Sequence, residues 1–144
     1  MKTANIEVQA EKDWMLPTKK HPSDAAFDLK CAKKFTILSS EILVVDTGIK
    51  VSIPDGFAGF IMSRSGMATS GITVANGVGL IDSGYLGEIK VILHNSRRVQ
   101  TFEAGSRIAQ ILFIELPTVN FDIVPQLTVT TLRGENGLGS TGIG

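Results

Sequence analysis

The chain contains 144 residues, the length of a single domain, and its 14 Lys and Arg residues balance 14 Asp and Glu residues. A formal net charge of zero argues against a general nucleic-acid-binding protein, because such proteins carry a basic surplus. A composition of 43% hydrophobic and 19% charged residues excludes a disordered chain, and its many Val, Ile and Thr residues favour β-strands.

Five segments have the pattern of short β-strands, and turns containing Gly or Pro separate several of them. In chain order they are residues 5–9, 48–53, 57–62, 88–93 and 107–114. Within the second of these, alternation places Ile49, Val51 and Ile53 on one face. A short helix fits only at residues 65–69. Many short strands with frequent turns predict an all-β fold of the sandwich, jelly-roll or barrel type.

Residues 107–114 differ from the other predicted strands because they are apolar on both faces. Since an isolated antiparallel sheet usually has one solvated face, we expect two covers, the second being another sheet or another subunit. By alternation Gln110 shares a face with Ile108 and Leu112, which is unusual for a polar amide. Its side chain either satisfies a buried backbone group or faces a ligand.

Two clusters flanked by glycine contain polar residues that a β-sheet core does not need. Residues 63–66 combine hydroxyl groups, a guanidinium group and a glycine N–H, which suit phosphate oxygens but also a surface turn. Residues 76–88 begin with an Asn-Gly pair that predicts a hairpin. Asp82 follows an apolar pair, which leaves two interpretations open: a partly buried carboxylate that acts as a general base, or an exposed turn aspartate.

The C-terminal residues 133–144 are rich in glycine and bury little surface by themselves. A frayed terminus is one interpretation of such a segment. The other is a flexible arm that closes over an anionic ligand, since Arg133, Ser140, Thr141 and exposed backbone N–H groups all suit phosphate oxygens.

The sequence also limits the chemistry that we expect. Cys31 is the only cysteine, which excludes an intrachain disulfide and a cysteine-based zinc site within one chain. No apolar run is long enough to span a membrane and no secretory signal is visible, so we expect a cytoplasmic protein with no membrane and no nucleic-acid partner. No metalloprotease, P-loop or dinucleotide-binding motif occurs, and no Ser/His/Asp triad is indicated.

Taken together and in order, these clusters resemble the trimeric dUTP pyrophosphatase (dUTPase) family. The segments that resemble its five motifs are residues 25–29, 64–68, 79–88, 105–110 and 133–142. Five motifs in order at the family's spacing are specific, and they span nearly the whole chain. The resemblance implies an all-β, jelly-roll subunit in residues 1–132 with one short helix at most. It also implies a flexible arm, residues 133–144, that closes over an active site in the trimer.

The resemblance further implies an enzyme that hydrolyses dUTP to dUMP and pyrophosphate with Mg²⁺, a dUTP diphosphatase. In the family, water attacks the α-phosphate, and the reaction keeps uracil out of DNA and supplies dUMP for thymidylate synthesis. Each active site of the homotrimer is assembled from three subunits. The resemblance leaves room for a second, regulatory role with a protein partner, which the sequence does not identify.

Each matching residue acquires a role from the resemblance. Asp82 would orient and deprotonate the attacking water, and Tyr85 would pack against the deoxyribose and exclude a 2′-hydroxyl group. The hairpin 76–82 would present backbone groups to the uracil edge, and Asp28 would approach the metal through water. The substrate-binding residues implied in this way are Arg64, Ser65, Gly66, Asn76, Gly79, Ile81, Tyr85, Gln110, Arg133, Leu138, Gly139, Ser140 and Thr141.

Three residues depart from the family pattern. Ser63 stands where the family often has Pro or Gly, and Ser106 stands where it usually has Asp. Leu138 replaces the Phe that stacks on the uracil ring. Because a leucine covers a ring but has no π-face to stack, we expect a looser closed state than in a typical member.

Two other functions compete with this interpretation. A dCTP deaminase shares the jelly roll and much of the third motif, but it places a catalytic Glu where this chain has Ile92. A non-catalytic dUTPase-like module that binds a nucleotide or a protein as a switch is the second alternative. The presence of Asp82 and Tyr85 argues against binding as the sole function.

Overall fold

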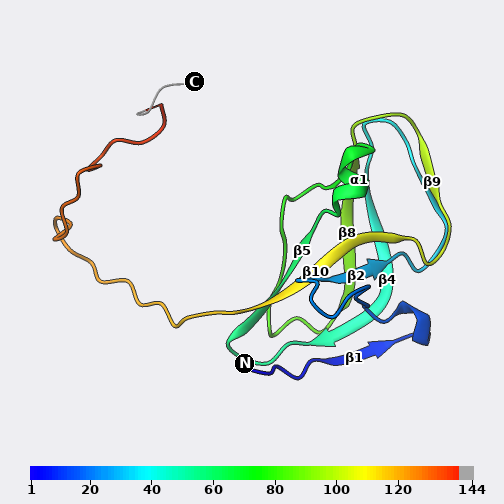
Figure 1. The fold of residues 1–144 in the computed structure, drawn as a ribbon, viewed down its shortest axis with the longest axis horizontal. Coiled ribbons are helices and arrows are strands. Elements are labelled where there is room, and N and C mark those ends of the chain that lie inside the picture. The colour runs from blue at the N-terminus through cyan, green and yellow to red at the C-terminus, as the bar shows by residue number, and fades with distance from the viewer. Residues whose placement is uncertain (140–144) are drawn as a thin grey trace.

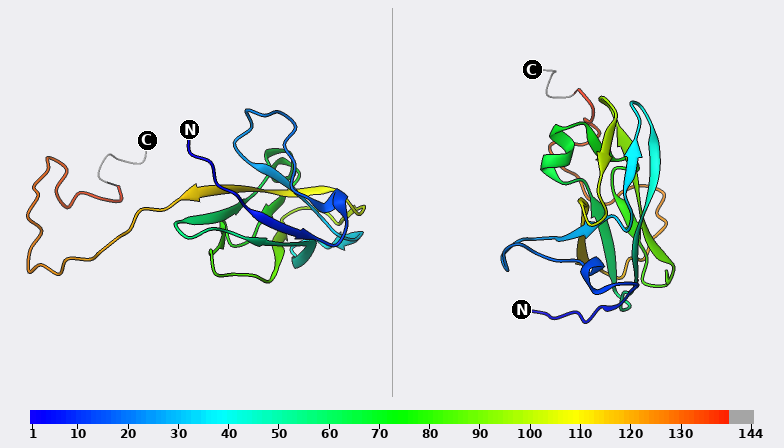
Figure 2. Two further views of the ribbon diagram at one scale, coloured as in Figure 1. Left: turned by 90° about the horizontal axis from the view of Figure 1, so that it is seen from below. Right: turned by 90° about the vertical axis from the view of Figure 1, so that its right-hand side faces the viewer.

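The fold is given by a computed structural model that describes residues 1–139, and it contains two four-stranded antiparallel sheets (Figures 1 and 2). The first sheet has the order β1 (Glu7–Ala10), β4 (Ile42–Ser52), β8 (Glu88–Asn95), β6 (Ile72–Val74). The second has the order β2 (Phe27–Lys30), β10 (Arg107–Glu115), β5 (Phe57–Met62), β7 (Gly79–Ile81).

A two-stranded ribbon and two short helical turns complete the described elements. The ribbon pairs β3 (Phe35–Ile37) with β9 (Gln100–Phe102), and the helical turns are η1 (Asp13–Met15) and α1 (Ser65–Thr69). The expected all-β jelly roll with one short α-helix is confirmed, and α1 occupies the residues predicted for it. No helix within residues 1–139 is long and apolar enough to cross a membrane.

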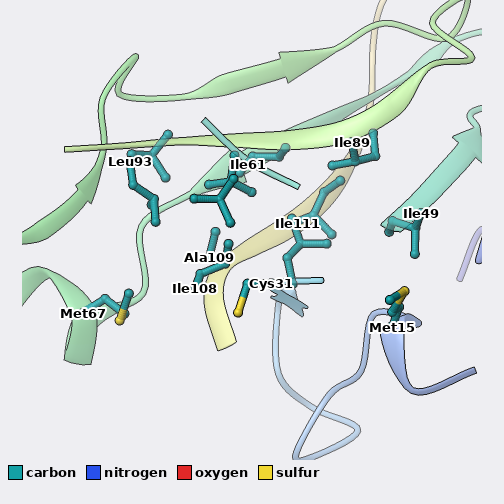
Figure 3. Close-up of a cluster of buried hydrophobic side chains, with 14 of the residues drawn as sticks. Met15, Cys31, Ile49, Ile61, Met67, Ile89, Leu93, Ile108, Ala109 and Ile111 are labelled. Atoms are coloured by element: carbon teal, nitrogen blue, oxygen red, sulfur yellow. The ribbon is translucent and has the colours of Figure 1, made fainter. Parts of the chain in front are cut away.

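The core lies between the two sheets, where alternating apolar side chains of both sheets meet (Figure 3). Ile49 and Val51 of β4 are at most 3% exposed, as the alternation predicts. Ile89 and Leu93 of β8 are fully buried, and Ile111 of β10 lies in the same cluster. Each such side chain stabilises the fold by about 1.5–3 kcal/mol relative to an exposed position.

Strand β10 occupies the middle of the second sheet, between β2 and β5. Ala109 and Ile111 are buried, whereas Leu112 and Ile114 are only half-buried. The register with β2 shifts between Arg107 and Ala109, so Ile108 is buried together with Ala109 and the simple alternation fails at this end. One of the two predicted covers is therefore the opposite sheet, and the outer face of β10 remains partly open in one chain.

Strand β4 contains a bulge at Gly48, where its register with β8 shifts between Asp46 and Lys50. Gly48 has a φ of +75°, a conformation that favours glycine, and a Cβ atom there would collide with the sulfur of Met15. The Gly48 N–H donates to Oε2 of Glu88 at 3.0 Å instead of to the backbone ladder. The bulge therefore fixes the first residue of β8 and seats η1 against the sheet.

Cys31 is a fully buried thiol at the end of β2. Its Sγ–H donates to the carbonyl oxygen of Glu103 at 3.1 Å. Burial raises the pKa of the Cys31 thiol, so the side chain stays protonated and packs as a small apolar group.

The chain leaves the sheets after β10 and continues as a long segment that stands away from the two sheets (Figure 1). Residues 116–139 contain no strand or helix. Phe121 and Ile123 are at least 92% exposed, and Leu138 is fully exposed. The regular jelly roll thus ends at Glu115, and the division at residues 132 and 133 stays a prediction.

Candidate active site

A cluster of charged side chains forms where β2, β10 and the loop after β5 meet. Arg64 precedes α1, and its Nε donates to Oδ1 of Asp28 at 3.0 Å. The Arg64 Nη1 donates to the carbonyl oxygen of Arg107 at 3.2 Å, and the Nη1 of Arg107 lies 3.8 Å from Oδ2 of Asp28. The Asp28 side chain is only 18% exposed, so this arrangement holds two guanidinium groups in place around one carboxylate.

Gln110 fixes the loop that carries Arg64. Its Nε2 donates to the carbonyl oxygen of Ser63 at 2.9 Å, so it satisfies a backbone group, one of its two expected roles. The hydroxyl oxygen of Ser63 accepts a hydrogen bond from the N–H of Val74 at 2.9 Å. Ser65 and Gly66 follow in the first turn of α1 and are exposed, which leaves their hydroxyl and backbone N–H groups accessible to a ligand.

Asp82 lies in the turn that follows β7, the edge strand of the second sheet. A hollow of about 190 Å³ opens beside this turn and is lined by Leu80, Ile81, Asp82, Tyr85, Glu88 and Lys90. Of the two interpretations of Asp82, the partly buried carboxylate is wrong and the exposed turn aspartate is confirmed, because the turn stands at the sheet edge. Its carboxylate is therefore open to water and to a ligand in the hollow.

Tyr85 ties this turn together through two hydrogen bonds. Its backbone N–H donates to the carbonyl oxygen of Asp82 at 3.1 Å, and its hydroxyl donates to the carbonyl oxygen of Glu88 at 2.7 Å. Tyr85 remains 41% exposed, and it lines the hollow. One residue thus connects the general-base candidate to the start of β8.

Lys90 supplies positive charge to the same hollow, and sequence reasoning missed it. Its Nζ lies 2.7 Å from Oδ1 of Asp46 and 3.9 Å from Oε1 of Glu88. The hydrogen bond with Asp46 raises the pKa of Lys90, which keeps the ammonium group charged. Its only sequence signal is a lysine on the solvent side of an alternating strand, where lysines are common.

The predicted hairpin at residues 76–82 is wrong, although the turn itself is present. The Gly77 N–H donates to the carbonyl oxygen of Val74 at 3.0 Å, and Gly77 has a φ of +73°. However, β6 pairs with β8 in the first sheet, whereas β7 pairs with β5 in the second. The chain therefore crosses between sheets at Asn76, and it leaves Asn76 exposed, Gly79 buried and Ile81 half-buried.

One chain does not bring Asp82 and Arg64 together. Ile81 pairs with Gly59 near the start of β5, whereas Arg64 follows the end of that strand. At the rise of a β-strand, the path from Gly59 to Arg64 corresponds to about 16 Å. The structure therefore contains two separate halves of the predicted site, at opposite ends of β5.

The described arm residues of the predicted site lie outside both halves. The Nε of Arg133 donates to the carbonyl oxygen of Asn136 at 2.7 Å, which closes a local turn. Leu138 and Gly139 are exposed in the segment that stands away from the sheets (Figure 1). The predicted phosphate contacts Ser140 and Thr141 lie outside the described residues.

Comparison with known proteins gives one consistent family. The family model described as dUTPase matches residues 12–142. The chain is 40% identical over 131 residues to a deoxyuridine 5'-triphosphate nucleotidohydrolase of Cutibacterium acnes, covering 89% of this chain and 86% of that protein. It is 40% identical over 144 residues to the protein of the same name from Thermobifida fusca, covering 97% of this chain and 80% of that protein.

Solved structures agree with this family. The dUTPase of Staphylococcus bacteriophage 80alpha with dUPNHPP superposes with a TM-score of 0.88 and 25% identity, covering 98% of this chain and 100% of that chain. The phage protein is described as controlling transfer of virulence genes by a proto-oncogenic G protein-like mechanism.

Proposed function

The chain belongs to the dUTPase family, and from that premise we propose how its residues divide the work of the reaction. The protein is a dUTP diphosphatase, which hydrolyses dUTP to dUMP and pyrophosphate. The observation that supports our assignment best is the hollow beside β7, in which the exposed carboxylate of Asp82 and the ring of Tyr85 face the same space.

Asp82 is proposed to activate the water that attacks the α-phosphorus. A general base must be accessible to water and able to accept its proton, and an exposed carboxylate meets both conditions. Tyr85, held at both ends of the turn, packs against the deoxyribose and leaves no space for a 2′-hydroxyl group. The exposed turn at Asn76 and Gly77 presents backbone N–H and C=O groups to the uracil edge.

The charged cluster at the other end of β5 is proposed to bind the phosphates. Arg64 supplies a guanidinium group, and Ser65 and Gly66 supply hydroxyl and backbone N–H donors beside it. Asp28 and Gln110 act by holding this loop in place, through the 3.0 Å bond to Arg64 and the 2.9 Å bond to the Ser63 carbonyl. Phosphoryl transfer depends mainly on such positioning and charge neutralisation.

Family membership supports a divalent metal ion in the reaction, and we propose that the ion is Mg²⁺. Within residues 1–139 no group of three or more His, Cys, Asp or Glu side chains could hold a metal. Both oxygens of Asp28 already face guanidinium groups, which fits contact through water but not direct ligation. This suits Mg²⁺, which keeps several waters and binds substrate phosphates, where it neutralises their charge.

Nucleotide selectivity tests these assignments. We expect the protein to release pyrophosphate from dUTP and to spare UTP, dTTP and dCTP, because Tyr85 excludes the ribose and the turn at residues 75–78 fits uracil without a 5-methyl group. The measurement is kcat/KM for the four nucleotides in a pyrophosphate-release assay. Turnover of UTP comparable to that of dUTP would contradict the role of Tyr85. Turnover of dTTP comparable to that of dUTP, with UTP still spared, would contradict the role of the turn.

A homotrimer is proposed because one chain holds only the two separated halves of a site. The uracil half at β7 of one subunit and the phosphate half beside β10 of a second must meet around one nucleotide. The chain also needs a cover for apolar surface, since Val119, Phe121 and Ile123 alternate with polar residues like a strand and are 63%, 92% and 100% exposed. The half-buried outer face of β10 points to the same need.

Light scattering coupled to size-exclusion chromatography is expected to give about three times the 15.4 kDa of one chain. A mass of one chain at micromolar concentration would contradict the shared site, because Asp82 and Arg64 could then not act on one substrate molecule. A dimer would equally contradict the three-subunit arrangement.

A further inference from the structure

We propose that Gly87 is a positioning residue that sets the discrimination between deoxyribose and ribose nucleotides by giving the Tyr85 ring its place. The inference rests on the proposed function in one respect, namely that Tyr85 contacts the sugar. It adds a residue that touches no substrate and a physical reason for glycine at that position.

The ring of Tyr85 folds back over Gly87. A Cβ atom added to Gly87 would lie 2.6 Å from the Tyr85 hydroxyl oxygen, 2.8 Å from Cζ and 3.0 Å from Cε1. Ordinary contact begins at 3.4 Å, so any side chain at residue 87 must displace the ring. The tyrosine therefore occupies space that only a glycine leaves open.

The backbone at Gly87 does not itself require glycine. Its φ lies outside the left-handed region, unlike that of Gly48 or Gly77. Alanine at residue 87 is thus compatible with the local backbone, and the collision with the ring is the main consequence of a substitution. This separates an effect on Tyr85 from a general distortion of the turn.

The ring cannot move freely to relieve the collision. Its hydroxyl is bonded to the carbonyl oxygen of Glu88 at 2.7 Å, and its backbone N–H is bonded to the carbonyl oxygen of Asp82 at 3.1 Å. Glu88 is anchored in turn, because its carboxylate accepts the Gly48 N–H at the bulge of β4. A tyrosine has only two side-chain torsions, so displacement must break the hydroxyl bond and move the ring within the hollow.

The loop also offers a matched control. Gly84 directly precedes Tyr85, its φ also lies outside the left-handed region, and a Cβ atom there would meet nothing within 4 Å beyond its two chain neighbours, Ser83 and Tyr85. Gly84→Ala therefore makes the same chemical change in the same turn, and no residue beyond the two neighbours stands in the way of the added methyl group.

The experiment measures kcat/KM for dUTP and UTP in the wild type, Gly87→Ala and Gly84→Ala. We expect Gly87→Ala to lower the dUTP/UTP ratio at least tenfold, because a ring displaced by nearly an ångström no longer fills the space of the 2′-hydroxyl group. Gly84→Ala should keep the ratio within about twofold. An unchanged ratio in Gly87→Ala, or an equal loss in both variants, would overturn the proposal.

A second readout follows the ring directly, since Tyr85 is the only tyrosine of the chain. With ¹³C-labelled tyrosine, the ring NMR signals should shift in Gly87→Ala and stay in place in Gly84→Ala. Unmoved signals in Gly87→Ala overturn the positioning role whatever the kinetics show. Tyr85→Ala shows which assumption fails if the dUTP/UTP ratio of kcat/KM does not change in Gly87→Ala. If Tyr85→Ala also keeps the wild-type ratio, the proposed sugar contact is wrong. If Tyr85→Ala lowers the ratio and Gly87→Ala does not, the inference about Gly87 is wrong.

Discussion

Replacing Asp82 by asparagine is expected to lower kcat for dUTP by about 10²-fold or more, in line with the loss of a general base, and to leave nucleotide binding largely intact. Asparagine keeps the shape of the side chain but cannot take a proton from water. The fold should not suffer, because Asp82 is exposed and its carboxylate makes no hydrogen bond within residues 1–139. The measurements are kcat by pyrophosphate release and Kd for a non-hydrolysable dUTP analogue.

Asp55→Asn is a suitable control for this substitution. Asp55 is also exposed, and its Oδ1 accepts a hydrogen bond from Ser83 in the same turn at 3.4 Å, which the asparagine oxygen can still accept. We expect it to retain nearly the wild-type kcat. Wild-type turnover in Asp82→Asn would show that another group activates the water.

Deletion of residues 133–144 is expected to remove most of the activity and to change the stability of the folded chain little. The Arg133 side chain bonds only to Asn136 within the described residues, and Leu138 is fully exposed, so this segment adds little to the core. In the proposed closed state the arm supplies hydrogen-bond donors to the substrate phosphates, and a truncated chain cannot replace them. The measurements are kcat/KM for dUTP and the midpoint of thermal unfolding.

A full-length chain in which residues 133–144 are scrambled provides the control for the deletion. It keeps the length and composition of the arm but moves Arg133 away from the donors that follow it. It should be as inactive as the truncated chain and should unfold at the same temperature as the wild type. If the truncated protein remains folded and active, the segment is only a frayed terminus.

Local patterns predicted the strand faces well because their causes lie within a few residues. The alternation in residues 48–53 places Ile49, Val51 and Ile53 in the core, and all three are at most 3% exposed. The strand at residues 57–62 and the helix at residues 65–69 have the predicted bounds. An alternation with a period of two, or a polar cluster flanked by glycine, can be recognised without knowing which distant strands pair with it.

Sheet partners could not be predicted in the same way. The Asn-Gly signal specifies a turn at residues 76 and 77, but it does not say whether the flanking strands pair with each other. Here the strand before the turn, β6, pairs with β8, and the strand after it, β7, pairs with β5 in the other sheet. The exposure of Asp82 follows from this arrangement, because β7 becomes an edge strand. The shift at Ile108 likewise depends on pairing with β2, which lies far away in the sequence.

Only part of the candidate site could be predicted, because the rest of it also depends on strand pairing between distant segments. The resemblance brought Asp28 and Arg64 together as members of one site, and their carboxylate and guanidinium groups lie 3.0 Å apart. Lys90 carried no signal that distinguishes it from any solvent-facing lysine. The separation of Asp82 from Arg64 along β5 depends on strand order, which no single motif contains.

In the proposed homotrimer, the exposed apolar segment after β10 makes the stability of the chain depend on its concentration. In the proposed assembly, neighbouring subunits cover Phe121, Ile123 and Leu127, which are between 82% and 100% exposed in one chain. Dilution then weakens the folded state by mass action, as with any partner that binds only the native form. A chain that has not yet found its partners presents a strand-like sequence to proteases and to other unassembled copies. In the proposed assembly, a high local concentration of chains shortens the time for which this segment is exposed.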